Sequence, residues 1–182
     1  MHLIEVDNIF NPDDFTEFPF QNETDPIQNV TLFNYKEFPV LLQLVQNVVQ
    51  SIVSTNLNLG FSQQDLLERA EVQGQTYTGD VFVLHYDSYN EEVRALEPFG
   101  QRIITGLIYL NDDFEGGHTI FPKVDKTVVP KKAKMTLFTN VHDDLTLDEE
   151  SIHRATEVKN GKKSILNVWF REKPVVIKLT EN

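Results

Sequence analysis

The stretch Val81-Phe82-Val83-Leu84-His85-Tyr86-Asp87 ends an apolar run with two side chains that can bind a metal ion. Its β-branched and aromatic residues predict a strand over 80–87. Successive side chains of a strand point to opposite faces, so His85 and Asp87 are expected on one face. Much farther along the chain, His153 offers a second imidazole and is followed by Lys163. We therefore treat His85, Asp87 and His153 as a candidate metal site.

Two imidazoles and one carboxylate on one side of a metal ion leave further coordination positions open. This ligand set is typical of non-haem Fe(II) centres that must also bind a cosubstrate and O₂. Three other histidines compete for the site: His118 after two glycines, His142 in the triplet His142-Asp143-Asp144, and His2 beside the first residue. The acidic, turn-like surroundings of the triplet favour a solvated loop.

Lys163 admits two interpretations. A buried ammonium group is unfavourable unless an anion meets it. A dicarboxylate cosubstrate that chelates the iron at one end would place its far carboxylate against this lysine. The alternative is a surface lysine beside a turn, because Lys159, Lys162 and Lys163 cluster. The spacing alone favours neither interpretation.

The dipeptide Asn160-Gly161 is typical of a two-residue hairpin, which would pair Lys159 with Lys162. In that hairpin two directly opposed residues lie on the same face, and their residue numbers add up to an odd number. Since 153 and 163 add up to an even number, His153 and Lys163 would lie on opposite faces. They would then not share a pocket. Either the loop holds an odd number of residues, or the two flanking segments belong to different sheets around one interior. We expect the second, and that Asn160-Gly161 is not a simple hairpin turn.

The composition is that of an ordinary globular protein of 182 residues, 40% hydrophobic and 24% charged, for which we expect one domain over 1–182. The net charge of −12 disfavours nucleic acid as the main partner. The absence of cysteine excludes disulfides, thiolate nucleophiles and Cys-ligated metal sites. With no signal-like start and no apolar run of bilayer length, we expect a cytoplasmic protein without a membrane segment, either a monomer or a homodimer.

Helices are predicted in the first part of the chain. Apolar residues within 36–53 recur at helical spacing, and Ser62 caps a second helix that runs to about residue 70. A weak strand at 2–10 precedes a short helix or turn at 11–15. We accordingly expect residues 1–75 to form a helical support, 76–172 a strand-rich core and 173–182 a C-terminal strand or tail.

Short runs rich in Val, Ile, Thr, Phe and Tyr, bounded by Gly, Pro, Asn and Asp, follow from residue 76 onward. Two helices followed by many strands predict a mainly β fold, an antiparallel sandwich or barrel with flanking helices. The segment 88–101 interrupts the strands as either an active-site lid or a plain surface insertion. The expected strands are 80–87, 102–110, 117–121, 126–129, 134–140, 151–158, 163–171 and 174–179.

Five blocks between about Gln73 and Glu172 agree in order and spacing with one family. The sequence resembles the catalytic domain of the Fe(II)/2-oxoglutarate dioxygenases, specifically the prolyl 4-hydroxylase group. The blocks are His85-Tyr86-Asp87; Arg102-Ile103-Ile104-Thr105-Gly106-Leu107-Ile108-Tyr109-Leu110-Asn111; Gly116-Gly117-His118-Thr119-Ile120-Phe121-Pro122; Pro130-Lys131-Lys132-Ala133 with Leu137-Phe138; and Ser151-Ile152-His153-Arg154-Ala155 with Gly161-Lys162-Lys163 and Trp169.

The resemblance implies a double-stranded β-helix, or jelly roll, supported by N-terminal helices. It implies His85, Asp87 and His153 as iron ligands and Lys163 as the partner of the distal carboxylate of 2-oxoglutarate. It further implies a hydrogen bond from the Tyr109 hydroxyl to that carboxylate and a second pocket tyrosine, Tyr77. His118 and His142 match no ligand of the family.

The resemblance also implies a reaction in which a prolyl residue of a peptide or protein is hydroxylated, with release of succinate and CO₂. The implied cofactors are Fe(II), 2-oxoglutarate, O₂ and ascorbate. Hydroxylation of another peptidyl residue or of a free amino acid is the alternative within this chemistry, and a non-catalytic jelly-roll binding module is the alternative outside it. Many relatives carry a small residue where this chain has Arg154, which is expected to point away from the iron.

Overall fold

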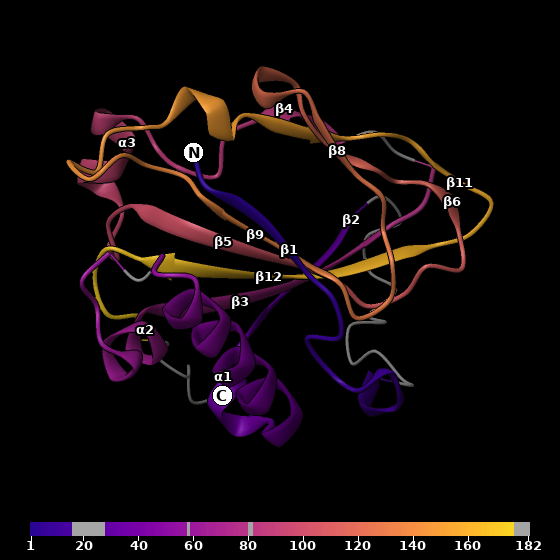
Figure 1. Ribbon diagram of the computed structural model, residues 1–182, viewed down its shortest axis with the longest axis horizontal. Coiled ribbons are helices and arrows are strands. Elements are labelled where there is room, and N and C mark those ends of the chain that lie inside the picture. Colours follow the sequence, from indigo (N-terminus) through magenta and orange to yellow (C-terminus); the bar gives the residue numbers. More distant parts are fainter. Residues whose placement is uncertain (16–27, 58, 80–81, 177–182) are drawn as a thin grey trace.

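Two antiparallel sheets face one another in the computed structural model, which describes residues 1–15, 28–57, 59–79 and 82–176 (Figure 1). Within these residues a six-stranded sheet has the order β1-β9-β5-β12-β3-β2, a four-stranded sheet has the order β4-β10-β7-β8, and β11 pairs with β6. The strands are β1 Leu3–Val6, β2 Gln28–Phe33, β3 Ala70–Tyr77, β4 Phe82–His85, β5 Arg102–Tyr109, β6 Glu115–Gly116, β7 Thr119–Phe121, β8 Lys126–Val128, β9 Met135–Thr139, β10 His153–Ala155, β11 Val158–Lys159 and β12 Lys163–Arg171. This arrangement confirms the predicted jelly roll.

Two of the three α-helices among the described residues, α1 and α2, cover the outer face of the large sheet (Figure 1). The α-helices are α1 Pro39–Ser54, α2 Gln63–Arg69 and α3 Glu91–Leu96, and the short 3₁₀ helices are η1 Pro12–Phe15, η2 Tyr35–Glu37, η3 Pro122–Val124 and η4 Glu149–Ser151. The apolar face predicted for α1 is buried against the sheet, as expected from its spacing. The helix approaches β5 closely at Gly106, where a Cβ would lie 3.3 Å from Val48 Cγ1. Ser62 and Asp65 form a reciprocal capping box at the start of α2, which confirms the predicted cap.

Strand β12 separates the two halves of the core. Its even-numbered residues Leu166, Val168 and Phe170 belong to the apolar core that contains α1. Its odd-numbered residues Lys163, Ile165, Asn167 and Trp169 line a cavity between the sheets. The strand alternation therefore divides β12 into a structural face and a functional face.

The expected boundary between a helical support at 1–75 and a strand core from 76 is wrong. Strand β3 begins at Ala70, directly after α2, and pairs with β12 inside the large sheet. Strands β1 and β2 form the two edges of the same sheet. Strand β3 escapes prediction because Gln73 and Gln75 turn toward the cavity, so its inward face is polar and the usual apolar alternation is absent.

Several predicted strands are shorter than expected. The strand expected at 80–87 ends at His85, so Asp87 lies beyond it. The strand expected at 2–10 is confined to Leu3–Val6, and 11–15 contains the predicted short helix. Residues 151–158, expected as one strand, instead contain the last residue of η4, the whole of β10 and the first residue of β11. Of the strand expected at 174–179, residues 174–176 are irregular and 177–179 lie outside the described residues.

The prediction about Asn160-Gly161 is confirmed. Strand β11 pairs with β6, whereas β12 pairs with β3 and β5, so the dipeptide links two different sheets. His153 and Lys163 can therefore face one interior from different sheets. No helix in the described part of the chain has the length and apolar character needed to cross a membrane.

Candidate active site

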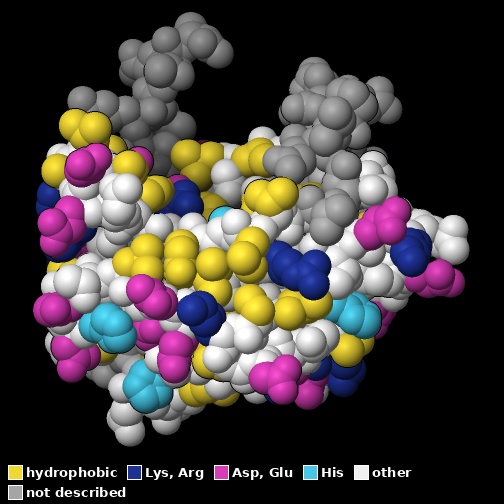
Figure 2. Space-filling model, turned by 90° about the horizontal axis from the view of Figure 1, so that it is seen from above, with side chains coloured by type: hydrophobic (Ala, Val, Ile, Leu, Met, Phe, Trp, Pro, Cys, Tyr) yellow, Lys and Arg dark blue, Asp and Glu magenta, His cyan; other side chains and the backbone are white. Residues whose placement is uncertain are grey.

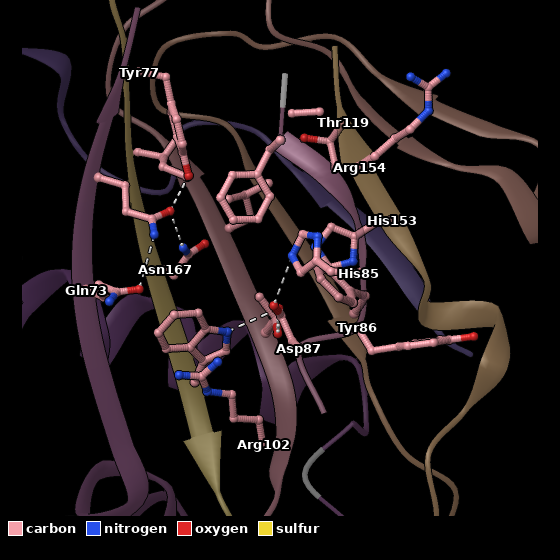
Figure 3. Close-up of a pocket in the computed structure, with 18 of the residues that line it drawn as sticks. Gln73, Tyr77, His85, Tyr86, Asp87, Arg102, Thr119, His153, Arg154 and Asn167 are labelled. Carbon is pink, nitrogen blue, oxygen red and sulfur yellow. Dashed lines mark hydrogen bonds and ion pairs between the residues drawn. The ribbon is translucent and has the colours of Figure 1, made fainter. Parts of the chain in front are cut away.

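His85, Asp87 and His153 converge inside the sandwich. One potential ligand atom from each residue lies within 4.8 Å of the others. His85 ends β4 and His153 begins β10, and the two residues are direct cross-strand partners whose ring centroids lie 4.3 Å apart. Asp87 reaches the cluster from the irregular segment after β4 (Figure 3). The structure thus brings together the three side chains that the sequence singles out.

Each histidine is oriented by a backbone carbonyl two residues earlier. Nδ1 of His85 lies 2.9 Å from the Val83 carbonyl oxygen, and Nδ1 of His153 lies 2.9 Å from that of Ser151. A carbonyl oxygen only accepts hydrogen bonds, so Nδ1 is the donor in both rings. In the neutral rings Nε2 then keeps its lone pair for a metal ion. Nε2 of His85 already lies 3.6 Å from Asp87 Oδ1.

The protonation states of Asp87 and His153 suit metal binding. Burial alone would raise the pKa of Asp87, but the neighbouring imidazoles of His85 and His153 and the hydrogen bond from Thr105 outweigh it, so this pKa is lowered. Burial lowers the pKa of His153. At neutral pH the cluster therefore offers a carboxylate and an uncharged buried imidazole, which are the forms that bind a metal ion.

Lys163 is buried rather than exposed, so the surface interpretation of this residue is wrong. It is 2% exposed, and its Nζ donates a hydrogen bond of 2.6 Å to the Gly117 carbonyl oxygen. In the described part of the chain no carboxylate forms an ion pair with it. Burial lowers its pKa to about 7. An uncompensated buried ammonium of this kind is a ready partner for an anionic ligand.

One cavity of about 280 Å³ connects these groups. The histidine–aspartate cluster and Lys163 both line it, as do the side-chain amides of Gln73, Gln75 and Asn167. Figure 3 shows Tyr77 and the amides on the large sheet, facing the two histidines across the cavity. A metal ion and an anion bound near Lys163 would therefore lie in the same space.

The two predicted tyrosines occupy different positions. Tyr77 lines the cavity, and its hydroxyl donates a hydrogen bond to the Gln75 side-chain oxygen. Tyr109 is fully buried, and its hydroxyl lies 2.8 Å from that of Thr119, which lines the cavity. The predicted bond from Tyr109 to a ligand stays a prediction, and Thr119 stands between this tyrosine and the cavity.

The remaining candidate residues lie outside the cluster. His2 and His142 are exposed, and His118 is partly exposed and does not line the cavity. Arg154 lies at the rim, where its exposed guanidinium points away from the two histidines, as strand alternation predicts (Figure 3).

The segment 88–101 contributes no residue to the cavity wall and contains α3. The Arg94 guanidinium forms two hydrogen bonds of 2.9 Å with the Glu172 carboxylate. The Gln101 side chain bonds both the backbone N–H and the carbonyl of Tyr89. These contacts favour the plain surface insertion over the lid.

The sequence reasoning missed several residues of the site, among them Thr105 and Trp169, both of which donate hydrogen bonds to Asp87. The sequence did contain a signal for these residues, because every second residue of a strand lies on the same face. Counting in twos from Lys163 along its strand gives Asn167 and Trp169. The same steps from Tyr109 reach Thr105.

Comparisons with known proteins agree with this geometry. The family model of the 2OG-Fe(II) oxygenase superfamily matches residues 72–171. A putative prolyl 4-hydroxylase of Acanthamoeba polyphaga mimivirus is 36% identical over 94 residues, which cover 49% of this chain and 39% of the relative. Prolyl 4-hydroxylase 1 of Arabidopsis thaliana is 33% identical over 126 residues, covering 62% of this chain and 44% of the relative. The chain thus spans less than half the length of these relatives.

The fold is also shared with a solved structure. The viral collagen prolyl hydroxylase of Paramecium Bursaria Chlorella virus-1, crystallised with 2OG, superposes with a TM-score of 0.65. It is 22% identical, and the superposition covers 94% of this chain and 96% of that chain. The family match covers more than half of this chain and includes His85, Asp87, His153 and Lys163. This chain therefore belongs to the 2OG-Fe(II) oxygenase superfamily.

Proposed function

We propose that this chain is an Fe(II)- and 2-oxoglutarate-dependent hydroxylase that acts on a prolyl residue of a peptide or protein. The observation that carries the proposal is the single cavity that holds both the His85–Asp87–His153 cluster and the buried, uncompensated Lys163. Prolyl 4-hydroxylases among the relatives support proline as the target.

The donor set fits the metal that the family uses. Nε2 of His85 and His153 and Oδ1 of Asp87 would hold Fe(II) on one side, and two imidazoles with one carboxylate suit this ion. The ammonium of Lys163 would pair with the distal carboxylate of 2-oxoglutarate. When bound, iron with 2-oxoglutarate and O₂ supplies the oxidation that hydroxylates carbon and releases succinate and CO₂.

Aromatic rings surround the two histidines. The rings of Phe121 and Phe138 lie 5.3 Å and 5.1 Å from the His153 ring, and the Phe82 ring lies 4.6 Å from that of His85. These rings make the surroundings of the cluster less polar. The protein would in this way protect a reactive centre from side reactions.

Two features support a peptide over a free amino acid. The cavity wall carries the amides of Gln73 and Asn167, which can bond a peptide backbone. On the face shown in Figure 2, apolar side chains lie among charged ones, and Val83 and Leu84 on β4 are 72% and 50% exposed just before His85. Exposed apolar residues beside a cavity are typical of a surface that binds a larger partner.

The proposal is tested by incubating the protein with Fe(II), 2-oxoglutarate, ascorbate and proline-rich peptides. We propose ascorbate as the reductant that keeps the iron in its ferrous form. We expect succinate in proportion to peptides that gain one oxygen on proline, measured by mass spectrometry. Oxygen on another residue would favour the alternative hydroxylase. If the protein neither produces succinate nor binds 2-oxoglutarate, the non-catalytic module is favoured. Such a scaffold would have no need for a buried ammonium without an anionic partner.

The affinity of the metal-loaded protein for 2-oxoglutarate is expected to fall as the pH rises above 7. Burial lowers the pKa of Lys163 to about 7, so the free protein loses this ammonium at higher pH. Each pH unit above the pKa lowers the protonated fraction of Lys163 about tenfold. The affinity for 2-oxoglutarate should therefore fall by up to about 100-fold by roughly pH 9. Calorimetric titration of the Co(II)-loaded protein measures this change. Pyruvate lacks the distal carboxylate and is the matched control; an equal fall for pyruvate would contradict the role of Lys163.

A further inference from the structure

We propose that Thr105 is a positioning residue that selects which oxygen of Asp87 faces the metal ion. The inference rests on the proposed function, because it takes the histidine–aspartate cluster to be the metal site. Thr105 lies in the middle of β5 and is 1% exposed. Its side chain would act through Asp87 and would not touch the metal itself.

Two donors hold the oxygen of Asp87 that is turned away from the histidines. Oδ2 accepts a hydrogen bond of 2.7 Å from the Thr105 hydroxyl and one of 3.1 Å from Nε1 of Trp169. A carboxylate oxygen has two lone pairs, so these bonds occupy Oδ2. Oδ1 is the oxygen that lies 3.6 Å from Nε2 of His85. Asp87 therefore presents one oxygen to the cluster.

The direction of the Thr105 hydroxyl is itself fixed. Nδ2 of Asn140 donates a hydrogen bond of 2.8 Å to Thr105 Oγ1. A hydroxyl group has one hydrogen, so the hydrogen of Thr105 remains for Asp87. Asn140 is fully buried, and its backbone N–H and carbonyl are bonded to Ile103 and Asp148. The three residues form a chain of hydrogen bonds from Asn140 through Thr105 to Asp87.

Asp87 needs such support because of its place in the fold. His85 and His153 sit on paired strands, whereas Asp87 follows the end of β4 in an irregular segment. Among the described residues no strand pairs with its backbone, so a carboxylate without side-chain partners would rotate and would present either or both oxygens. Ligation through Oδ1 alone leaves one more position open for cosubstrate and O₂. These hydrogen bonds thus fix the Asp87 carboxylate from β5 and from Asn140, which directly follows β9.

The test compares Thr105→Val with Thr105→Ser, using Co(II) as the probe. Valine keeps the shape and removes the hydroxyl, so we expect the Kd for Co(II) to rise about 10- to 100-fold, as for other residues that orient a metal ligand. Serine restores the donor, so the Kd should stay within about threefold of the original. The visible spectrum of bound Co(II) should change for valine alone, because it reports how the carboxylate coordinates.

Two further variants keep the test decisive. Thr136→Val removes an equally buried hydroxyl from β9 that does not line the cavity, and it should leave the Co(II) affinity unchanged. Trp169→Phe removes the other donor to Asp87 and should also weaken binding. If a variant unfolds more easily, the shift in Tm that Co(II) produces separates metal affinity from stability.

Unchanged Co(II) affinity and spectrum in Thr105→Val would overturn the inference. If the original protein binds Co(II) and makes succinate while Thr105→Val binds Co(II) equally well, the inference fails and the proposed function stands. If the original protein neither binds Co(II) nor makes succinate, both fail together.

Discussion

Replacing His153 with alanine is expected to abolish metal binding and to lower turnover by about three orders of magnitude or more. The imidazole is one of the two in the cluster, and its Nε2 is held free by the bond from Nδ1 to the Ser151 carbonyl. The remaining pair, His85 and Asp87, would leave the metal ion with too few protein ligands. Succinate release and calorimetric titration with Co(II) measure the two effects separately.

The fold should survive this substitution. Alanine removes a buried ring that packs against Phe121 and Phe138, a loss of about 1–3 kcal/mol of unfolding free energy. The variant should therefore unfold cooperatively without the rise in Tm that Co(II) gives the original protein. His118→Ala is the matched control, because His118 does not line the cavity and its loss should leave metal binding unchanged. Retained Co(II) binding in His153→Ala would remove His153 from the metal site.

Spacing along the chain singled out His85, Asp87 and His153, and the family resemblance set aside the competing histidines, although the reason given for Asp87 was only partly correct. The prediction placed His85 and Asp87 two residues apart on one strand, yet the strand ends at His85. Asp87 joins the cluster through its hydrogen bonds with Thr105 and Trp169. These contacts cross between segments distant in sequence, so no local pattern reveals them.

Two of the missed elements, strand β3 and helix α3, share one physical cause. Strand β3 faces a polar cavity with Gln73 and Gln75, and helix α3 buries none of its residues. Neither has the apolar periodicity that marks a strand or helix packed on a core. The one local signal for α3 is Asn90, whose side chain caps the helix by accepting a bond from the Val93 N–H. Helix α1 and strand β12, which do pack on the core, were predicted closely.

Replacing Lys163 with methionine is expected to have opposite effects on ligand affinity and on stability. Methionine has a similar length and no charge, so the distal carboxylate of 2-oxoglutarate would lose its ionic partner. A charge-assisted pair in a buried site corresponds to about a 100-fold higher 2-oxoglutarate requirement. The affinity for Co(II) should stay unchanged, because Lys163 is not part of the cluster.

The stability of the ligand-free protein should rise in the same variant. Burial lowers the pKa of Lys163 from 10.5 to about 7, so the charged form destabilises the fold. Below pH 7 the lysine is charged in both the folded and unfolded states, and the full unfavourable energy of burial applies. Between about pH 7 and 10.5 the unfolded state binds more protons than the folded state, so the stability of the original protein rises with pH. The advantage of Lys163→Met should thus be largest at or below pH 7, on the order of 2–4 kcal/mol, and shrink as the pH rises.

Urea unfolding of both proteins without ligand, at several pH values from 6 to 9, measures this advantage. Lys162→Met is the matched control, since Lys162 is an exposed neighbour and should change neither the stability nor the 2-oxoglutarate requirement. Binding of an anion would explain why the buried ammonium of Lys163 is kept in place despite its unfavourable energy, so the two effects should appear together. A variant that is more stable but needs no more 2-oxoglutarate would show that another cation meets the distal carboxylate. A variant that is less stable would show that the bond to the Gly117 carbonyl outweighs the burial of the charge.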